Sequence, residues 1–161
     1  MGVWGCGSEG EISHTPIPPY PHTRMHKDLL NPPSLPSPSG YSHGVLAGPG
    51  RVLALAGQTG MDASGAITAP GDLVGQFRQA LANLQAVVVA AGGQMSDIVK
   101  LNLYVTDKAD YRANLRPLGE AYRAVFGRYY PAMTLVEVKS LFDDQALIEI
   151  EGLAVLPPGD A

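Results

Sequence analysis

Two stretches near the C-terminal end alternate apolar side chains with acids, and this alternation constrains the fold more than any other feature. They cover residues 132–141 and 147–156. Successive side chains of a β-strand point to opposite faces of the sheet. In the second stretch, Ile148 and Ile150 therefore share one face, while Glu149 shares the other with leucine and valine. The pattern predicts two strands whose sheet has an apolar face and a mixed face.

The acids on the mixed face allow two interpretations. A carboxylate among apolar neighbours needs a partner, or its pKa rises. Glu149 and Glu151 are therefore candidates for a functional site. A strand with one solvated face explains the same pattern, and the alternation by itself does not separate the two. Glu137, on the preceding strand, is interpreted as structural.

Composition limits the class of protein and of partner. A chain of 161 residues suits one domain, and 45% apolar residues suffice for a core. Only 16% of the residues are charged, which suggests that part of the surface is buried against another subunit. The formal charge of −4 argues against a nucleic-acid partner, because phosphate binding favours a basic patch.

Cysteine content and hydropathy bear on location. The single cysteine, Cys6, allows no disulfide within the chain, which fits a reducing compartment. No apolar run is long enough to cross a membrane, and the first residues lack the pattern of a signal peptide. We expect a cytoplasmic protein without a membrane partner.

The N-terminal segment differs in composition from the rest. Residues 1–30 are predicted to form a flexible tail rich in proline and glycine, followed by a single domain over residues 31–158. Met25 is an alternative start, in which case the preceding residues are an extension. The segment Pro18–Pro21 is compatible with a proline-rich recognition ligand or with a plain tail.

The periodicity of the folded part predicts an α+β domain of the order β-β-α-β-α-β-β. Two helices can cover one face of a single sheet. The other face would expose apolar side chains, so we expect a closed homo-oligomer that covers it. The predicted elements are strands over 42–46 and 51–56, a helix over 72–91, a strand over 98–106, a helix over 109–126 interrupted near Pro117, and strands over 132–141 and 147–156.

Basic and histidine side chains give weaker signals. Arg112, Arg116 and Arg123 follow helical spacing, which suits either an anion-binding or RNA-binding surface or a solvated helix face. The histidines have no acids or cysteines at ligand spacing, so no metal site is expected.

Several motifs, taken in order, resemble those of the Rid family (reactive intermediate deaminases, the YjgF-type proteins). The similarity covers about residues 31 to 155. It implies a chorismate-mutase-like α+β fold and a homotrimer with ligand clefts between subunits. The motifs are NPP at 31–33, GYSHGV at 40–45, AGQTG at 56–60, DIVK at 97–100, PAMTLVEV at 131–138 and IEIE at 148–151.

The resemblance also implies roles for individual residues. Active family members hydrolyse imines and enamines to ketones and ammonia without a cofactor, and the acid matched by Glu149 orients or activates the water. An arginine that pairs with the substrate carboxylate corresponds here to Met133, whose thioether carries no charge. This departure points to the subgroups that lack the arginine.

Further residues are expected to contact substrate on the same grounds. Gly57 allows a close backbone approach, and its neighbour Ala56 stands where some members have serine. Tyr41 matches an aromatic residue at the mouth of the cleft. Leu135 matches a side chain that is cysteine in some members.

The sequence thus favours a trimeric Rid-like protein that binds a small metabolite in an intersubunit cleft. Hydrolysis of an imine or enamine with Glu149 is the first interpretation, and the loss of the arginine counts against amino-acid-derived imines. A metabolite sensor without catalysis is the alternative. RNA binding, or a ribonuclease-type inhibitor of translation, fits the negative charge less well.

Overall fold

The computed structural model describes residues 26–158. Residues 1–25, with Cys6 and the proline segment, lie outside the described residues. Strand β1 (Lys27–Leu30) falls inside the segment that the sequence assigned to a tail. The folded part therefore begins before residue 31.

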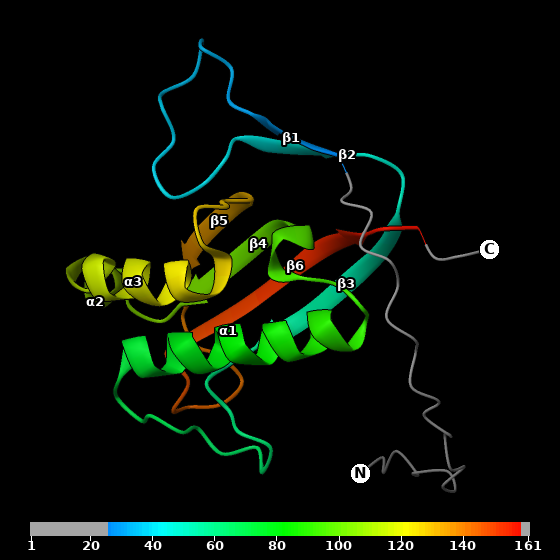
Figure 1. Ribbon diagram of the computed structural model, residues 1–161. Coiled ribbons are helices and arrows are strands. Elements are labelled where there is room, and N and C mark those ends of the chain that lie inside the picture. Colours follow the sequence, from blue (N-terminus) through cyan, green and yellow to red (C-terminus); the bar gives the residue numbers. More distant parts are fainter. Residues whose placement is uncertain (1–25, 159–161) are drawn as a thin grey trace, which may run out of the picture.

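Four strands form the main sheet in the order β3-β6-β4-β5 (Figure 1). Strand β6 is antiparallel to both of its neighbours, whereas β4 and β5 run parallel. The parallel pair requires a crossover, which the helical segment between the two strands supplies. The strands are β3 (Arg51–Gln58), β4 (Ile98–Val105), β5 (Ala132–Glu137) and β6 (Ile148–Leu156).

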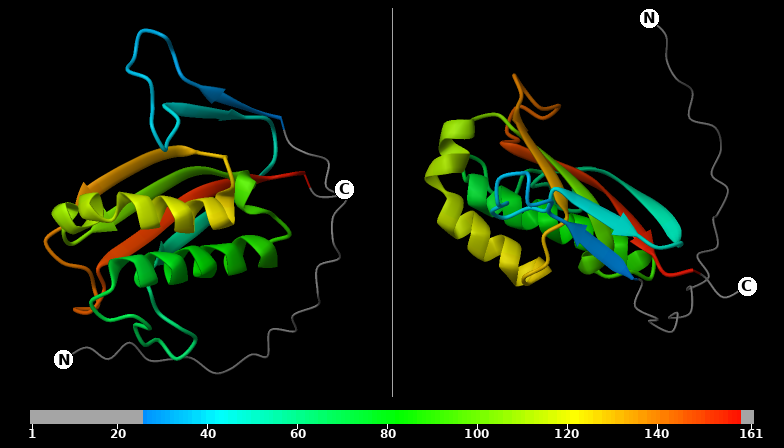
Figure 2. Two further views of the ribbon diagram at one scale, coloured as in Figure 1. Left: turned by 60° about the vertical axis from the view of Figure 1, so that its left-hand side comes forward. Right: turned by 90° about the horizontal axis from the view of Figure 1, so that it is seen from above.

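Helices α1 (Leu73–Ala90) and α3 (Leu115–Phe126) lie side by side on one face of this sheet (Figure 2). We call that face of the sheet the helix face and the opposite one the open face. Asp72 caps α1 by accepting a hydrogen bond from the N–H of Gly75, as the sequence predicted. The short 3₁₀ helix η1 (Met95–Asp97) leads into β4. The mixed α+β class predicted from the periodicity is confirmed.

The second helical region is broken, but not at Pro117. It divides into α2 (Lys108–Ala113) and α3, with Asn114 between them. Pro117 is the third residue of α3, where a backbone N–H would have no partner within the helix, so the ring is tolerated. Asp107 caps α2 through the N–H groups of its first turn.

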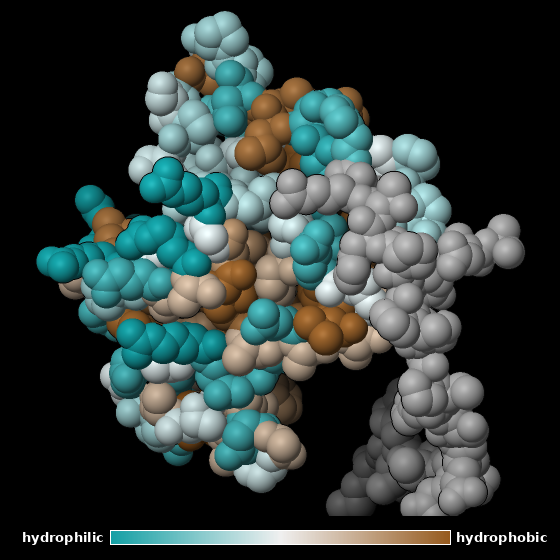
Figure 3. All heavy atoms as spheres, viewed as in Figure 1, coloured by the Kyte–Doolittle hydropathy of each residue, from teal (hydrophilic) through white to brown (hydrophobic). Residues whose placement is uncertain are grey.

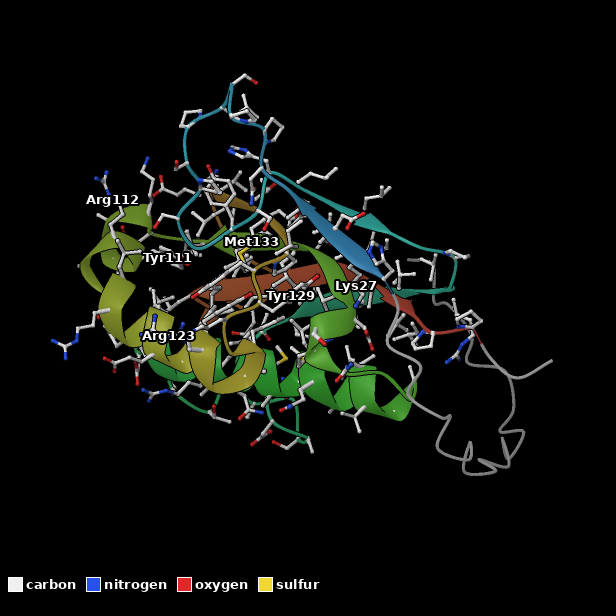
Figure 4. The ribbon with its side chains drawn as sticks, turned by 45° about the horizontal axis from the view of Figure 1, so that its top comes forward. Lys27, Tyr111, Arg112, Arg123, Tyr129 and Met133 are labelled. Carbon is white, nitrogen blue, oxygen red and sulfur yellow. The ribbon has the colours of Figure 1, made fainter. Side chains whose placement is uncertain are left out.

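The prediction of a single sheet is wrong in one respect. Strand β2 (Gly44–Ala47) pairs with β1 in a separate two-stranded sheet rather than with β3. Lys27 ties this small sheet to η1, because its Nζ donates to the Asp97 carboxylate at 2.8 Å and to the Ser96 carbonyl at 2.5 Å. Figure 4 shows Lys27 near the Tyr129 ring, whose centroid is 6.0 Å from Nζ.

The core fills the space between the helix face and the helices. Leu101, Leu103, Ile148 and Ile150 point into it from β4 and β6. The predicted strand over 132–141 ends earlier, at Glu137. Within residues 26–158, no helix has the length and hydropathy needed to cross a membrane.

Apolar side chains remain exposed on the small sheet and on the open face. Figure 3 shows a hydrophobic patch over β1 and β2, where Leu30 and Leu46 are 47% and 60% exposed. On the open face, Val52 is 72% and Leu153 is 43% exposed. These surfaces are the ones that an assembly of several copies would cover.

Candidate functional site

A cavity of about 790 Å³ opens on the helix face, between the sheet and the helices. Its floor comes from β4, β5 and β6, and its walls come from all three α-helices and the loop before β2. Figure 4 shows Tyr111, Arg112 and Arg123 on α2 and α3, with Met133 on β5. Three residues expected to contact substrate line the cavity: Tyr41, Met133 and Leu135.

Hydrogen bonds hold the loop that carries Tyr41 against the segment just before β5. The Ser42 N–H donates to the Pro131 carbonyl at 3.0 Å, and its hydroxyl donates to the Tyr130 carbonyl at 2.7 Å. Ser42 is buried, so these bonds are shielded from water. They hold the loop against β5, and Tyr41 becomes part of the cavity wall.

The register of β5 turns Met133 and Leu135 toward the helices. In the parallel pair, Leu101 faces Met133 and Leu103 faces Leu135, and both β4 residues are buried under the helices. Side chains directly opposite each other lie on the same face of a sheet. Met133 therefore lies on the helix face, at an edge of the sheet.

Glu149 lies on the other side. It pairs with Tyr104, whereas its neighbours Ile148 and Ile150 are buried on the helix face. Gly57 lies directly against it, because a Cβ built on Gly57 would be 1.8 Å from Oε1 of Glu149. Any side chain at position 57 would therefore displace the carboxylate.

A β-bulge produces this contact. Leu55 pairs with Gly152 and Gln58 with Ile150, so Ala56 and Gly57 together oppose the single residue between those two partners. A bulge bends its strand and re-aims the local groups, and bulges are frequent next to active sites. Ala56 and Gly57 are both exposed here, so this part of the backbone is accessible.

The two acids of β6 differ in their bonding. The Glu151 carboxylate accepts hydrogen bonds from the Tyr104 hydroxyl at 2.7 Å and from the Asn102 amide at 2.9 Å. These bonds lower the pKa of Glu151, and the bond to Glu151 raises the pKa of Tyr104. Within residues 26–158, the Glu149 carboxylate accepts no hydrogen bond that would occupy it in this way.

The six residues expected in the site therefore form two groups on opposite faces of the sheet. Tyr41, Met133 and Leu135 line the cavity on the helix face. Ala56 and Gly57 form the bulge, and Glu149 lies against Gly57 on the open face. One copy of the chain does not bring the two groups together.

Sequence reasoning missed much of the cavity wall. Lys108, Arg112 and Arg123 contribute cationic side chains to it, and Tyr111 contributes an aromatic ring. The helical spacing of the arginines was a signal, but spacing alone does not show which of them turn toward the sheet.

The rings of Tyr122, Phe126 and Tyr130 stiffen one wall. Tyr122 stacks between the other two, with centroid distances of 4.4 Å to Phe126 and 5.2 Å to Tyr130. Its hydroxyl donates to the Tyr129 carbonyl at 2.9 Å. Burial raises the pKa of Tyr122 and of Tyr111, so both phenols stay neutral near neutral pH.

Comparison with known proteins identifies the family. A family model described as Endoribonuclease L-PSP matches residues 33–156. A RutC family protein of Pyrococcus horikoshii is 36% identical over 129 residues, which is 80% of this chain and 97% of that protein. A 2-iminobutanoate/2-iminopropanoate deaminase of Dermatophagoides farinae is 32% identical over 131 residues, or 81% of this chain and 97% of that protein.

A solved structure agrees with these relatives. The Rid family protein YyfB of Yersinia pestis, whose function is unknown, has a TM-score of 0.74 and 34% sequence identity. The match covers 82% of this chain and all of that one. This chain belongs to the Rid family, which also includes the deaminase relatives.

Proposed function

We propose that this chain is a cytoplasmic homotrimer that binds a small imine or enamine in a cleft between subunits and hydrolyses it to a carbonyl compound and ammonia. In this proposal Glu149 orients the water, and backbone groups at Gly57 hold a polar atom of the ligand. No cofactor takes part. Relatives named 2-iminobutanoate/2-iminopropanoate deaminase support the reaction class.

The unoccupied carboxylate of Glu149 carries the proposal. Glu151, two residues away, is held by two hydrogen bonds from β4, whereas Glu149 lies half-buried against Gly57 and accepts no comparable bond from any residue between 26 and 158. A carboxylate free to accept a proton beside an accessible backbone can act as general base.

The chemistry balances without another reagent. Water adds to the carbon of the protonated imine as Glu149 accepts one of its protons, which gives a neutral carbinolamine. Glu149 then returns this proton to nitrogen, and the C–N bond breaks as the C=O bond forms. Glu149 takes up the hydroxyl proton that this step releases and passes it to the departing ammonia, which leaves as ammonium. A carboxylate with a fixed position and a free oxygen suffices for these transfers.

The division of the candidate residues between two faces supports a shared site. If the bulge of one subunit covers the cavity of the next, Glu149 meets a ligand that lies against Met133 of another copy. The exposed apolar residues on β1, β2 and the open face are compatible with such contacts.

Imine hydrolysis tests the proposal. An amino acid oxidase would generate imines in situ from acidic, neutral and basic amino acids, and imine loss would be followed with wild type, Glu149→Gln and Met133→Arg. Turnover by wild type that is lost in Glu149→Gln supports the proposal. The proposal is contradicted if neither wild type nor either variant hydrolyses any of the imines.

A metabolite sensor is the second candidate, and Met133 is the observation that favours it. A thioether in the cavity offers no charge to a substrate carboxylate, as expected of a binding site that no longer processes α-imino acids. Glu149→Gln separates the candidates, because it abolishes turnover in an enzyme and largely spares binding in a sensor. Activity gained only in Met133→Arg favours the sensor or a different substrate.

A further inference from the structure

The three arginines of the second helical region have different surroundings. Arg116 pairs with Glu120 one turn further along α3, with Nε 3.2 Å from Oε1, and its side chain is largely exposed. Arg112 and Arg123 instead line the cavity, together with Lys108. The arginines share a helical spacing but differ in their surroundings. Arg116 lies in an exposed ion pair, and Arg112 and Arg123 belong to the cavity.

The cavity has an excess of positive charge. Among the described residues that line it, three are cationic and none is an aspartate or a glutamate. This contrasts with the whole chain, whose formal charge is −4. A cavity lined by charges of one sign concentrates ligands of the opposite sign.

Arg123 is the best placed of these cations. Its guanidinium lies back along α3 against Gly119, where a Cβ would be 3.2 Å from Nη1. Gly119 also lines the cavity, so the small residue leaves room for the guanidinium at the cavity wall. A guanidinium can bind a carboxylate through two parallel hydrogen bonds.

Apart from Ser39 and the hydroxyl groups of its tyrosines, the rest of the cavity is apolar. Leu81, Leu101 and Leu118 are buried in its depth, whereas Lys108, Arg112 and Arg123 are exposed at its margin. Figure 4 shows Arg112 and Arg123 on the helices that flank the cavity, with Met133 across from them. A ligand that fits has an apolar body and an anionic group at one end.

We propose that this cavity binds an organic carboxylate with an apolar body, and that Arg123, assisted by Arg112 and Lys108, holds the carboxylate. The anion then lies toward α3 instead of beside residue 133. The substrate class is an imine or enamine whose carboxylate is separated from the C=N carbon by an apolar chain or ring. This substrate assignment rests on the proposed function, but the carboxylate site does not.

Isothermal titration calorimetry with matched probes tests the site. The probes are 3-phenylpropionate and hexanoate, each compared with its neutral amide. Wild type is expected to bind a carboxylate about tenfold more tightly than the amide, because a charge-assisted hydrogen bond separates them. Arg123→Gln is expected to remove that difference without weakening binding of the amide.

Arg116→Gln is the matched control, since it removes a guanidinium of the same helix that is paired with Glu120. It is expected to leave carboxylate binding unchanged. The proposal is overturned if acid and amide bind equally, if no carboxylate binds, or if Arg116→Gln weakens binding as much as Arg123→Gln does.

The two proposals can fail separately. Carboxylate binding that depends on Arg123, in a protein that hydrolyses no imine, leaves this inference standing and contradicts the proposed function. The opposite result is imine hydrolysis that depends on Glu149 and is unaffected by Arg123→Gln, in a protein that binds carboxylates no better than their amides. It would support the proposed function and contradict the carboxylate site.

Discussion

At the scale of single residues, Gly57 is the position where one added methyl group acts most directly on the proposed base. The Cβ of Gly57→Ala would overlap Oε1 of Glu149 at 1.8 Å, so the carboxylate has to move. A misplacement of about 1 Å can lower a rate on the order of a hundredfold. We expect that loss in imine hydrolysis, with little change in the melting temperature.

Gly44→Ala is the control for this variant. A Cβ at Gly44 would lie 3.6 Å from the Cβ of Leu30, which is an ordinary contact. Full activity in Gly44→Ala and a large loss in Gly57→Ala support a role for the contact with Glu149. Unchanged activity in Gly57→Ala would mean that the position of this carboxylate does not matter.

The second residue prediction concerns pH. Hydrogen bonds, first that from Tyr104, hold the pKa of Glu151 below its ordinary value of 4.5. A depressed carboxylate pKa stabilises the fold above the ordinary pKa, and this contribution is lost as pH falls through the folded value. Tyr104→Phe is expected to raise the Glu151 pKa in an NMR titration and to lower stability near neutral pH.

Under strongly acidic conditions, where Glu151 is protonated in both proteins, this difference between wild type and Tyr104→Phe disappears. Tyr111→Phe serves as the control, because Tyr111 lies in the cavity on the other side of the sheet. A Glu151 pKa that is the same in wild type and Tyr104→Phe would contradict the assignment.

At this scale the sequence predicted which acids share a face but not how each is bonded. Glu149 and Glu151 are equivalent in the alternation of β6. What separates them is Asn102 and Tyr104 on the neighbouring strand, and the register of β4 against β6 decides that contact. Register depends on the tertiary pairing of strands, so no local pattern reveals it.

At the scale of elements, buried Gln76 ties α1 to the two loops next to it. Its Nε2 donates to the carbonyls of Ala69 and Gln145, at 3.1 and 2.9 Å, and its Oε1 accepts from the N–H of Leu147 at 2.7 Å. The helical periodicity of α1 marks residue 76 only as a position near the core. Its function as a polar connector depends on a chain segment 69 or more residues away.

Gln76→Leu is therefore expected to destabilise the fold although it adds apolar area. It leaves two carbonyls and one N–H without these partners, at a cost of about 3 kcal/mol. Urea unfolding measures the difference. Gln79→Leu, which removes one bond to Asn83 within the same helix, is expected to cost about 0.5 kcal/mol. Equal losses in the two variants would contradict this view of Gln76.

The elements themselves were largely predictable, because hydrophobic periodicity and caps are local. The helix predicted over 72–91 is observed at Leu73–Ala90, and the break in the second helical region was predicted close to its position. The partner of β2 was not predictable. Strand β2 pairs with β1, and the bond from Lys27 to Asp97 holds β1 against η1. That bond joins residues 70 positions apart.

At the scale of the whole molecule, the main question is how residues on two faces of one sheet can serve one site. The sheet separates Glu149 and Gly57 from Met133 and Leu135. A shared site in a closed homo-oligomer requires one group from each of two neighbouring copies. A site within one copy would make one of the two groups irrelevant to activity.

Mixing of two inactive variants distinguishes these cases. Glu149→Gln removes the carboxylate of the open-face group, and Met133→Trp fills the cavity, so each variant on its own is expected to be inactive. After denaturation and refolding together in equal amounts, a neighbour pair with both groups intact arises in up to about a quarter of the sites. Imine hydrolysis is then expected to return to about that fraction of the wild-type rate.

The matched control mixes Glu149→Gln with Gly57→Ala. Both changes disable the same open-face group, because one removes the carboxylate and the other displaces it. No combination of these two chains contains an intact open-face group, so activity stays at the level of the separate variants. Size-exclusion chromatography verifies that every mixture forms the same oligomer as wild type. Recovery in the first mixture alone supports a site shared between subunits, because only there can one chain supply what its neighbour lacks. Recovery in neither mixture, with the oligomer intact and both variants inactive on their own, would mean that no site is completed by groups from two subunits, and it would overturn the shared cleft.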